Sequence, residues 1–408
     1  MTDSTLLVTV TGPDRPGVSA RLLSTLSVFP ITIVDLEQVL ISDRLVLGAQ
    51  LAVDTRAAPG VRRRDLFAEI RGALAKVSAE LGMDVSVEDG DDATLQPGAE
   101  GRLHVTLLAS PLRPAALGAI TSCIARGGGN IDRIERLASY PVTAVELVVS
   151  GGDVERLRGE LSTEAAAQGI DIAVQPSGLH RRAKHLIVMD VDSTLIQGEV
   201  IELLAAHAGC ADEVARVTEE AMLGEMDFEK SLRQRVALLK GLDASVLDVV
   251  SQELVLTPGA RTMVRTLKRL GYEFAIVSGG FTQITDTLVG ELGIDYCAAN
   301  TLEVVDGKLT GDIVGPVVDR AGKAAALRQF AAEARVPLNQ TVAIGDGAND
   351  LDMLQAAGLG VAYNAKPVVR AAADTSVSVP YLDTIVFLLG ISREEVEAAD
   401  RENDPSDG

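Results

Sequence analysis

The residues best suited to do chemistry in this chain are two aspartates that follow an apolar run. Residues 186–189 read Leu-Ile-Val-Met, and Asp190 and Asp192 come directly after them. Such a run predicts a buried parallel strand, and open α/β sheets bind ligands beyond the carboxyl ends of their strands. We therefore expect one carboxylate to face an electrophile while the other moves protons nearby. Taken alone, the Asp-x-Asp pattern equally fits a turn with solvated acids.

Two further motifs could hold a phosphate group. Residues 274–277 form another apolar run, which ends in Ser278, Gly279 and Gly280. The serine hydroxyl can bind a phosphate oxygen, and the glycines let backbone amides approach it. Lys323 lies near the start of an alanine-rich helical pattern, where it can offset charge on a transferring phosphoryl group. Each motif alone also fits an ordinary turn or a surface lysine.

A third strand end is rich in oxygen ligands. The apolar residues 341–344 are followed by Gly345, Asp346, Gly347, Ala348, Asn349 and Asp350. Carboxylate and amide oxygens at the end of a strand suit Mg²⁺, which keeps several waters and needs few carboxylates. This third motif therefore predicts a magnesium site.

In this order, the motifs resemble those of the haloacid dehalogenase superfamily of phosphatases. The match covers residues 184 to about 390. Within the superfamily, the chain most resembles the phosphoserine phosphatases, because residues 190–196 are followed at that family's spacing by Glu199, Met222, Phe228 and Arg235. The resemblance implies a doubly wound, mostly parallel α/β sheet over residues 184–393. It also implies that an insertion at about 200–256 forms a small helical cap.

The resemblance assigns chemical roles. Asp190 is expected to attack phosphorus and form an aspartyl-phosphate, while Asp192 protonates the leaving serine oxygen and then activates water. The expected cofactor is Mg²⁺, held by Asp190, by the main-chain carbonyl of Asp192 and by Asp346. The groups expected to hold the phosphoryl oxygens are Ser278, Gly279, Lys323 and Asn349, with Asp350 orienting Lys323 or a metal-bound water.

The same resemblance predicts the substrate O-phospho-L-serine. Arg235 is expected to bind its α-carboxylate and Glu199 its α-ammonium, because a guanidinium can grip a carboxylate with two hydrogen bonds. Met222 and Phe228 are expected to supply apolar walls. On pattern alone, Glu199 and Arg235 would fit a solvated helix face. Two other functions stay open: phosphotransfer from phosphoserine to another alcohol such as homoserine, and a non-catalytic protein that senses amino acids.

The first part of the chain contains an internal repeat. Residues 1–88 and 102–176 each follow the order strand, helix, strand, strand, helix, strand, which predicts two ferredoxin-like βαββαβ domains. Both resemble ACT domains, which bind amino acids at their interfaces. The resemblance implies an amino-acid effector, L-serine, near Asp14, Gly17 and Asn130, because Gly17 frees backbone amides at a helix start where a carboxylate could dock. Alternatively, these domains dimerise without holding a ligand.

Composition sets the broad class. The chain has 408 residues and a formal net charge of −21, which argues against a nucleic-acid partner. We find no apolar run long enough for a membrane span, and three scattered cysteines suit a reducing cytoplasm. ACT domains commonly pair, so a homodimer is expected. Residues 394–408 are acidic and low in apolar side chains, and we expect this tail to fray.

Overall fold

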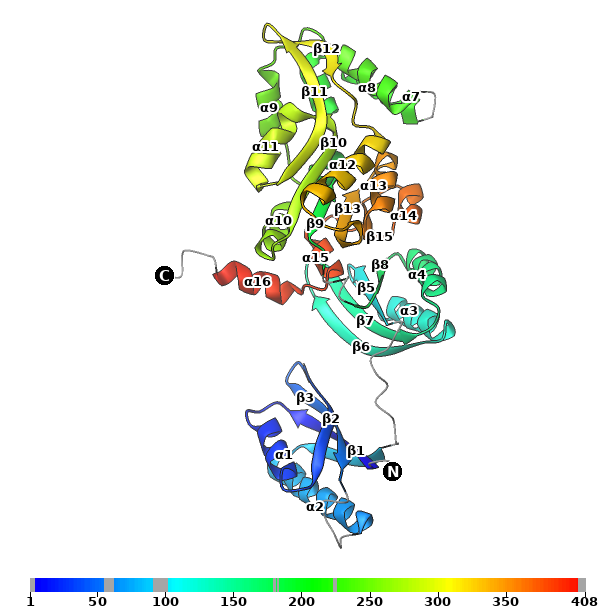
Figure 1. Cartoon of the computed structure of the whole chain (residues 1–408), viewed down its shortest axis with the longest axis vertical. Helices are drawn as coiled ribbons and strands as arrows, with labels where there is room; N and C mark the ends of the chain where they lie inside the picture. The colour runs from blue at the N-terminus through cyan, green and yellow to red at the C-terminus, as the bar shows by residue number, and fades with distance from the viewer. Residues whose placement is uncertain are drawn as a thin grey trace. The chain divides into compact units, whose positions relative to one another are not determined.

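The computed structural model describes residues 4–54, 62–90, 102–178, 181, 183–222 and 226–402. The chain divides into two compact units, Met1–Gly98 and Ala99–Gly408 (Figure 1). Among the described residues, no helix combines the length and the apolar character needed to cross a membrane.

The first unit is a four-stranded antiparallel sheet with helices on one face. Alternate residues of β3 are buried, from Leu45 to Val53, because side chains of a strand point to opposite faces in turn. They pack with Leu22 of α1 and Ile70 of α2. The sheet order is β2-β3-β1-β4, and the elements are β1 (Ser4–Pro13), α1 (Val18–Leu26), β2 (Ile31–Ile41), β3 (Arg44–Val53), α2 (Arg63–Leu81) and β4 (Asp84–Gly90).

The second unit begins with a repeat of the same arrangement. Its strands β8-β5-β7-β6 correspond in order to β4-β1-β3-β2 of the first unit. The predicted pair of βαββαβ domains is therefore confirmed. The elements are β5 (Leu103–Ala109), α3 (Pro114–Arg126), β6 (Gly129–Ala138), β7 (Thr143–Gly151), α4 (Val154–Gln168) and β8 (Asp171–Pro176).

The remainder of the second unit is the predicted doubly wound α/β fold. Its central strands are buried on both faces, as expected for parallel strands covered by helices (Figure 1). The strand order is β12-β11-β10-β9-β13-β14-β15, with only β12 antiparallel to its neighbour among the described strands of this part. The strands are β9 (Leu186–Met189), β10 (Glu273–Phe281), β11 (Tyr296–Val305), β12 (Lys308–Val314), β13 (Thr341–Gly345), β14 (Gly360–Tyr363) and β15 (Thr375–Val377).

Four helices lie among the described residues between positions 200 and 256, where the sequence predicts a cap. They are α6 (Val200–Ala208), α7 (Ala211–Met222), α8 (Phe228–Ala237) and α9 (Val246–Glu253). The two chain segments that connect them to the sheet run side by side. Ile196 and Leu256 form an antiparallel bridge, and the Thr257 N–H donates to the Leu195 carbonyl at 2.9 Å. The four helices are thus attached through one paired stalk.

The helices that flank the parallel sheet complete the unit. Among them, α12 follows the β11–β12 hairpin and presents Lys323 from its first turn, and a short 3-10 turn (Ala348–Asp350) follows β13. The flanking helices are α10 (Ala260–Arg269), α11 (Thr282–Leu292), α12 (Arg320–Glu333), α13 (Leu351–Ala356), α14 (Pro367–Ala372), α15 (Ile385–Leu388) and α16 (Arg393–Glu402).

The second βαββαβ domain shares its sheet with the α/β fold. Strand β15 pairs with β8 in antiparallel fashion at Thr375 and Ala173, which joins the two sheets into one of eleven strands among the described residues. The Thr375 hydroxyl donates to the Ile172 carbonyl at 2.8 Å, and the Gln175 amide donates to the Leu388 carbonyl at 2.7 Å. The predicted boundary at residues 176–184 therefore falls inside one compact unit.

The end of the chain differs from the sequence-based expectation. Residues 393–402 form helix α16, so the predicted fraying of the acidic tail is wrong for this part. Val396 is buried, and Asp400 accepts hydrogen bonds from Arg265 and Arg269 of α10. These contacts come from residues more than a hundred positions away, which composition does not reveal. Residues 403–408 lie outside the described part.

Candidate active site

A buried ion-pair cluster lies where β9 ends. Lys323 Nζ lies 2.6 Å from Asp190 Oδ1 and 2.8 Å from Asp350 Oδ1, and all three side chains are almost completely buried. The Val191 N–H also donates to Asp190 Oδ1 at 2.8 Å, whereas Asp190 Oδ2 has no hydrogen-bond partner among the described residues. Burial and the neighbouring Asp350 raise the pKa of Asp190, and Lys323 opposes that shift. The lysine, expected on pattern alone at the surface, therefore lies in the centre of the cluster.

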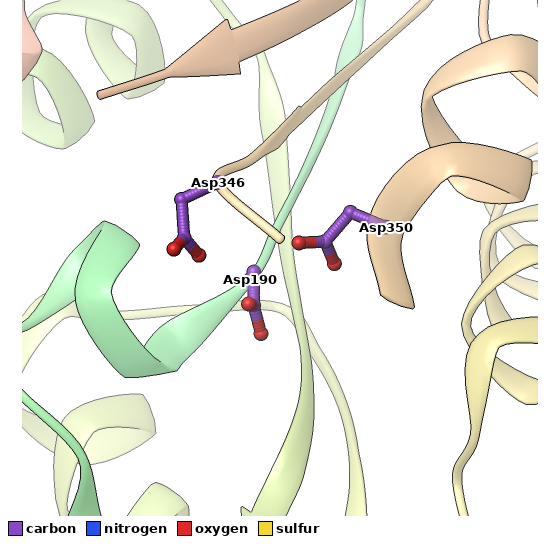
Figure 2. Close-up of side chains that lie close together, drawn as sticks. All are labelled: Asp190, Asp346 and Asp350. Carbon is purple, nitrogen blue, oxygen red and sulfur yellow. The ribbon is translucent and has the colours of Figure 1, made fainter. Parts of the chain in front are cut away.

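Asp346 completes a group of three carboxylates with Asp190 and Asp350. One oxygen from each lies within 4.8 Å of the others, and Figure 2 shows the three side chains converging from the end of β9, the loop after β13 and the start of α13. Burial and Asp350 raise the pKa of Asp346 to about 6, as expected for carboxyl groups crowded together. These are hard oxygen donors that suit Mg²⁺.

The glycines of the 345–350 motif make this crowding possible. A Cβ placed on Gly345 would lie 2.5 Å from Cγ of Asp350, and one on Gly347 would lie 2.1 Å from Oδ1 of Asn349. The Gly347 N–H donates to Asp350 Oδ2 at 3.0 Å, so hydrogen bonds engage each oxygen of Asp350. Asn349 is half-buried in the same turn.

Asp192 and Ser278 are in direct contact. The Ser278 hydroxyl donates to Asp192 Oδ2 at 3.1 Å, and the Val200 N–H donates to Asp192 Oδ1 at 2.8 Å. The Ser278 oxygen in turn accepts a hydrogen bond from the Gly280 N–H at 2.7 Å. Burial raises the pKa of Asp192 despite these hydrogen bonds, so its protonated form is favoured relative to an exposed aspartate.

Glu199 and Arg235 bring opposite charges to the cap side of the site. Glu199 precedes α6, and Arg235 lies on α8. Burial raises the pKa of Glu199 to about 7; Asp192 adds to the shift and Arg235 opposes it. Among the described residues, the buried Nε of Arg235 has no hydrogen-bond partner. The two groups are therefore near enough to influence each other but remain separate.

Phe228 brings helix α8 close to the Ser278-Gly279-Gly280 motif. It begins α8, where the Asp227 side chain accepts a hydrogen bond from the Lys230 N–H and so caps the helix. A Cβ on Gly279 would lie 3.0 Å from Cζ of Phe228, so a larger residue at this position would crowd the ring. Met222 ends α7, but its side chain lies outside the described part.

The residues predicted for effector binding lie in different units. Asp14 and Gly17 are exposed in the loop between β1 and α1, and Gly17 has φ 95°, a left-handed conformation that favours glycine. Asn130 lies in β6 of the second unit, where its side-chain amide donates to Asp132 at 3.0 Å. Asp14 and Gly17 therefore belong to one unit and Asn130 to the other.

Two threonines join the site without having been predicted from the sequence. The fully buried Thr194 donates from Oγ1 to Asp346 Oδ1 at 3.3 Å, and its carbonyl accepts a hydrogen bond from the Thr257 hydroxyl at 2.7 Å. Thr257 belongs to the segment that returns from the cap. Thr194 could have been predicted to lie near the site, because it comes four residues after Asp190. Nothing near Thr257 in the sequence indicates its contact with Thr194.

Comparison with known proteins matches this geometry to a family. Residues 187–355 match the model of the haloacid dehalogenase-like hydrolases, and residues 4–88 and 103–175 each match an ACT domain model. In solved structures, the chain resembles a haloacid dehalogenase family hydrolase of Salmonella enterica, with a TM-score of 0.62 and 27% identity over 70% of this chain and 98% of that one. It also resembles an unliganded probable phosphoserine phosphatase from Vibrio cholerae, with a TM-score of 0.56 and 37% identity over 74% of this chain and 89% of that one.

Similarity to curated proteins extends over nearly the full length. The chain is 60% identical to a phosphoserine phosphatase of Streptomyces coelicolor, covering 97% of this chain and 94% of the relative. It is 50% identical to the phosphoserine phosphatase SerB2 of Mycobacterium tuberculosis, covering 97% of this chain and 95% of the relative. The chain therefore belongs to the phosphoserine phosphatases of the haloacid dehalogenase-like hydrolase family, with two ACT domains before its catalytic segment.

Proposed function

We propose that this chain hydrolyses O-phospho-L-serine to L-serine and phosphate through an aspartyl-phosphate on Asp190. The observation that carries this proposal is the buried contact of Lys323 with Asp190, at the strand end where the phosphate-binding motif also lies. An oxygen of Asp190 attacks phosphorus, and the bond from phosphorus to the seryl oxygen breaks. Lys323 offsets the negative charge that the phosphoryl group brings to this carboxylate.

Asp192 handles the proton in both halves of the reaction. Its raised pKa favours a protonated side chain, which gives its proton to the leaving seryl oxygen. The resulting carboxylate then takes a proton from the water that attacks the aspartyl-phosphate, and this step releases phosphate and restores Asp190. The Ser278 hydroxyl donates a hydrogen bond to Asp192. With substrate bound, it would instead donate to a phosphoryl oxygen, together with the Gly279 amide and Asn349.

The oxygen donors of the site fit a magnesium ion. We propose Asp190, Asp346 and the main-chain carbonyl of Asp192 as its protein ligands, because Lys323 and the Gly347 N–H already engage the oxygens of Asp350. When bound, Mg²⁺ would reduce the repulsion between the nucleophilic carboxylate and the phosphate. Asp350 would orient Lys323.

The cap side would select the amino-acid part of the substrate. A zwitterion needs one cation and one anion held apart, and the separate charges of Arg235 and Glu199 meet that requirement. Arg235 would bind the α-carboxylate with its unpaired donors, and Glu199 would bind the α-ammonium. Phe228 would cover the bound serine from the cap, with Met222 as a second apolar wall.

Regulation and assembly form the second part of the proposal. We propose that an amino acid, L-serine, binds the ACT domains near Asp14, Gly17 or Asn130 and slows turnover, and that the chain forms a homodimer in the cytoplasm within serine biosynthesis. The exposed edge strand β2, with Val39, Leu40 and Ile41 more than half exposed, supports pairing of copies. The three free cysteines are consistent with a reducing compartment.

The test is phosphate release from O-phospho-L-serine with Mg²⁺. We expect turnover by the full chain, loss of turnover in Asp190→Asn, and poor turnover of phosphoethanolamine, which lacks the carboxylate that Arg235 would bind. Adding homoserine and measuring both free phosphate and phosphohomoserine separates hydrolysis from phosphotransfer. Unchanged phosphate release in Asp190→Asn would refute the nucleophile. Turnover that is unaffected by L-serine would refute the regulatory part alone.

A further inference from the structure

A buried asparagine links the two segments that are proposed to hold the phosphoryl group. Asn300 lies on β11 and is 1% exposed. Its Nδ2 donates to the Gly279 carbonyl at 2.8 Å, and its Oδ1 accepts from the Val318 N–H at 2.8 Å. The side-chain orientation follows from these partners, because a carbonyl needs a donor and an N–H needs an acceptor. Each end of the amide is thus bound to a different segment of backbone.

Each partner belongs to a chain segment that carries a residue of the proposed mechanism. Gly279 follows Ser278, whose hydroxyl contacts Asp192. Val318 precedes Asp319, which caps α12 by accepting a hydrogen bond from the Gly322 N–H at 2.8 Å. Lys323 lies in the first turn of that helix. A single side chain therefore bridges Gly279 and the segment that leads into the helix of Lys323.

The bond to Gly279 also determines which way that peptide group faces. A carbonyl bound by a side chain that is 1% exposed points into the protein interior. If the peptide unit rotated, its carbonyl oxygen would instead turn toward the phosphoryl oxygens and repel them. Glycine backbones rotate easily, so a motif with two adjacent glycines needs an external partner to keep one orientation.

We propose that Asn300 is a positioning residue for phosphoryl binding. It holds the Gly279 carbonyl away from the phosphate and keeps the Ser278 motif in register with Lys323. This inference rests on the phosphate-binding roles proposed above for Ser278, Gly279 and Lys323. Asn300 has no contact with substrate in this assignment; it acts through the backbone of its two partners.

The test replaces the amide by a carboxylate of the same shape. Asn300→Asp keeps the acceptor for the Val318 N–H, loses the donor to Gly279 and sets a carboxylate oxygen against a carbonyl. We expect the KM for O-phospho-L-serine and the inhibition constant of inorganic phosphate to rise by about tenfold each, the effect of losing roughly one buried hydrogen bond. Thermal unfolding of the full chain is measured alongside.

Gln175→Glu supplies a matched control. Gln175 is 6% exposed and also donates from its amide to a buried carbonyl, that of Leu388, at 2.7 Å. The same change from amide to carboxylate should lower the unfolding temperature here and leave KM and the phosphate inhibition constant within about twofold of wild type. If Asn300 served only the stability of the fold, Asn300→Asp would likewise lower the unfolding temperature and leave both constants unchanged.

The outcomes separate the inference from the proposed function. Wild-type turnover with unchanged KM and unchanged phosphate inhibition in Asn300→Asp would overturn the positioning role alone. Absence of wild-type turnover would overturn the proposed function, and the inference would fall with it. If Asn300→Asp does not fold, Asn300→Ala removes both bonding groups without adding a charge, and the same two constants then decide.

Discussion

Replacing Lys323 by methionine tests the electrostatic centre of the site. The Lys323 side chain is 1% exposed and lies 2.6 Å from Asp190 and 2.8 Å from Asp350. Methionine keeps an unbranched chain of similar volume but removes the charge and all donors. Two buried carboxyl groups would then face each other without a cation between them.

The expected loss of stability is large. Breaking a buried ion pair by removing one partner costs about 3–5 kcal/mol, because the remaining charge is left uncompensated. With about 2–4 °C of unfolding temperature per kcal/mol for a domain of this size, Lys323→Met should unfold roughly 10 °C below wild type in EDTA at pH 7.5. Turnover should fall by about a hundredfold or more, as it does when a group that stabilises developing charge is removed.

The dependence on pH distinguishes lost charge from lost packing. Lys323 lowers the pKa of Asp190, so removing it raises that pKa further above the value of an unfolded chain. A carboxyl group with a raised folded pKa destabilises the fold at high pH and ceases to do so once it is protonated. The stability deficit of Lys323→Met should therefore be large at pH 7.5 and smaller at pH 5.

Lys184→Met is the matched control. Lys184 is 4% exposed, and its Nζ donates to the Asn339 carbonyl at 2.6 Å without an ion pair among the described residues. Burial lowers the pKa of Lys184 to about 8, so its charge opposes folding by about 3 kcal/mol at neutral pH. Removing this lysine relieves that cost and loses one hydrogen bond worth about 1 kcal/mol, so the unfolding temperature should not fall, and any rise should be the same at pH 5 and pH 7.5. A deficit of Lys323→Met that is no larger than this, or that is the same at both pH values, would refute the reasoning.

Three further predictions follow from the same geometry. The pKa of about 7 for Glu199 predicts that kcat/KM for O-phospho-L-serine falls below pH 7, where the carboxyl group is protonated, and that Glu199→Gln flattens this limb of the pH profile. Because the pKa of Asp346 is about 6, added Mg²⁺ should raise the unfolding temperature more at pH 7.5 than at pH 5.5, as measured by calorimetry after EDTA treatment. Gly345→Ala places a Cβ 2.5 Å from Asp350 and should cost about 1–3 kcal/mol of stability together with most turnover, whereas Gly72→Ala, in open space on α2, should do neither.

The strand ends of the catalytic segment were predictable from the sequence for a physical reason. Parallel strands that are covered on both faces must be apolar throughout, so the first polar residues after each run mark the edge where ligands bind. Asp190, Ser278 and Asp346 all follow such runs, and the structure brings them to one edge. Lys323 lacks this signal, since a lysine in an alanine-rich helix fits the surface equally well. Only the resemblance to a family assigned it to the site.

Contacts between residues far apart in the chain could not be predicted from the sequence. Asn300 and Thr257 each bind backbone atoms of segments that no local pattern connects to them. The pairing of β15 with β8 depends on one register position, Thr375 with Ala173. The acidic helix α16 is held by a few distant arginines and one buried valine, which a composition argument cannot detect.

The charge balance of the site supports the proposed need for bound protons and a cation. Five carboxyl groups lie in the candidate site, those of Asp190, Asp192, Glu199, Asp346 and Asp350. If all five were ionised, the two cationic side chains Lys323 and Arg235 could not balance their charge. A bound phosphate dianion would add two more negative charges. The raised pKa values of Asp190, Asp192, Asp346 and Glu199 are the physical signature of this excess of negative charge. A protonated Asp192 removes one negative charge and is the form that an acid catalyst needs, while a divalent cation removes two more. In a chain whose net charge is −21, phosphate binding thus depends on local compensation, because the protein as a whole repels anions.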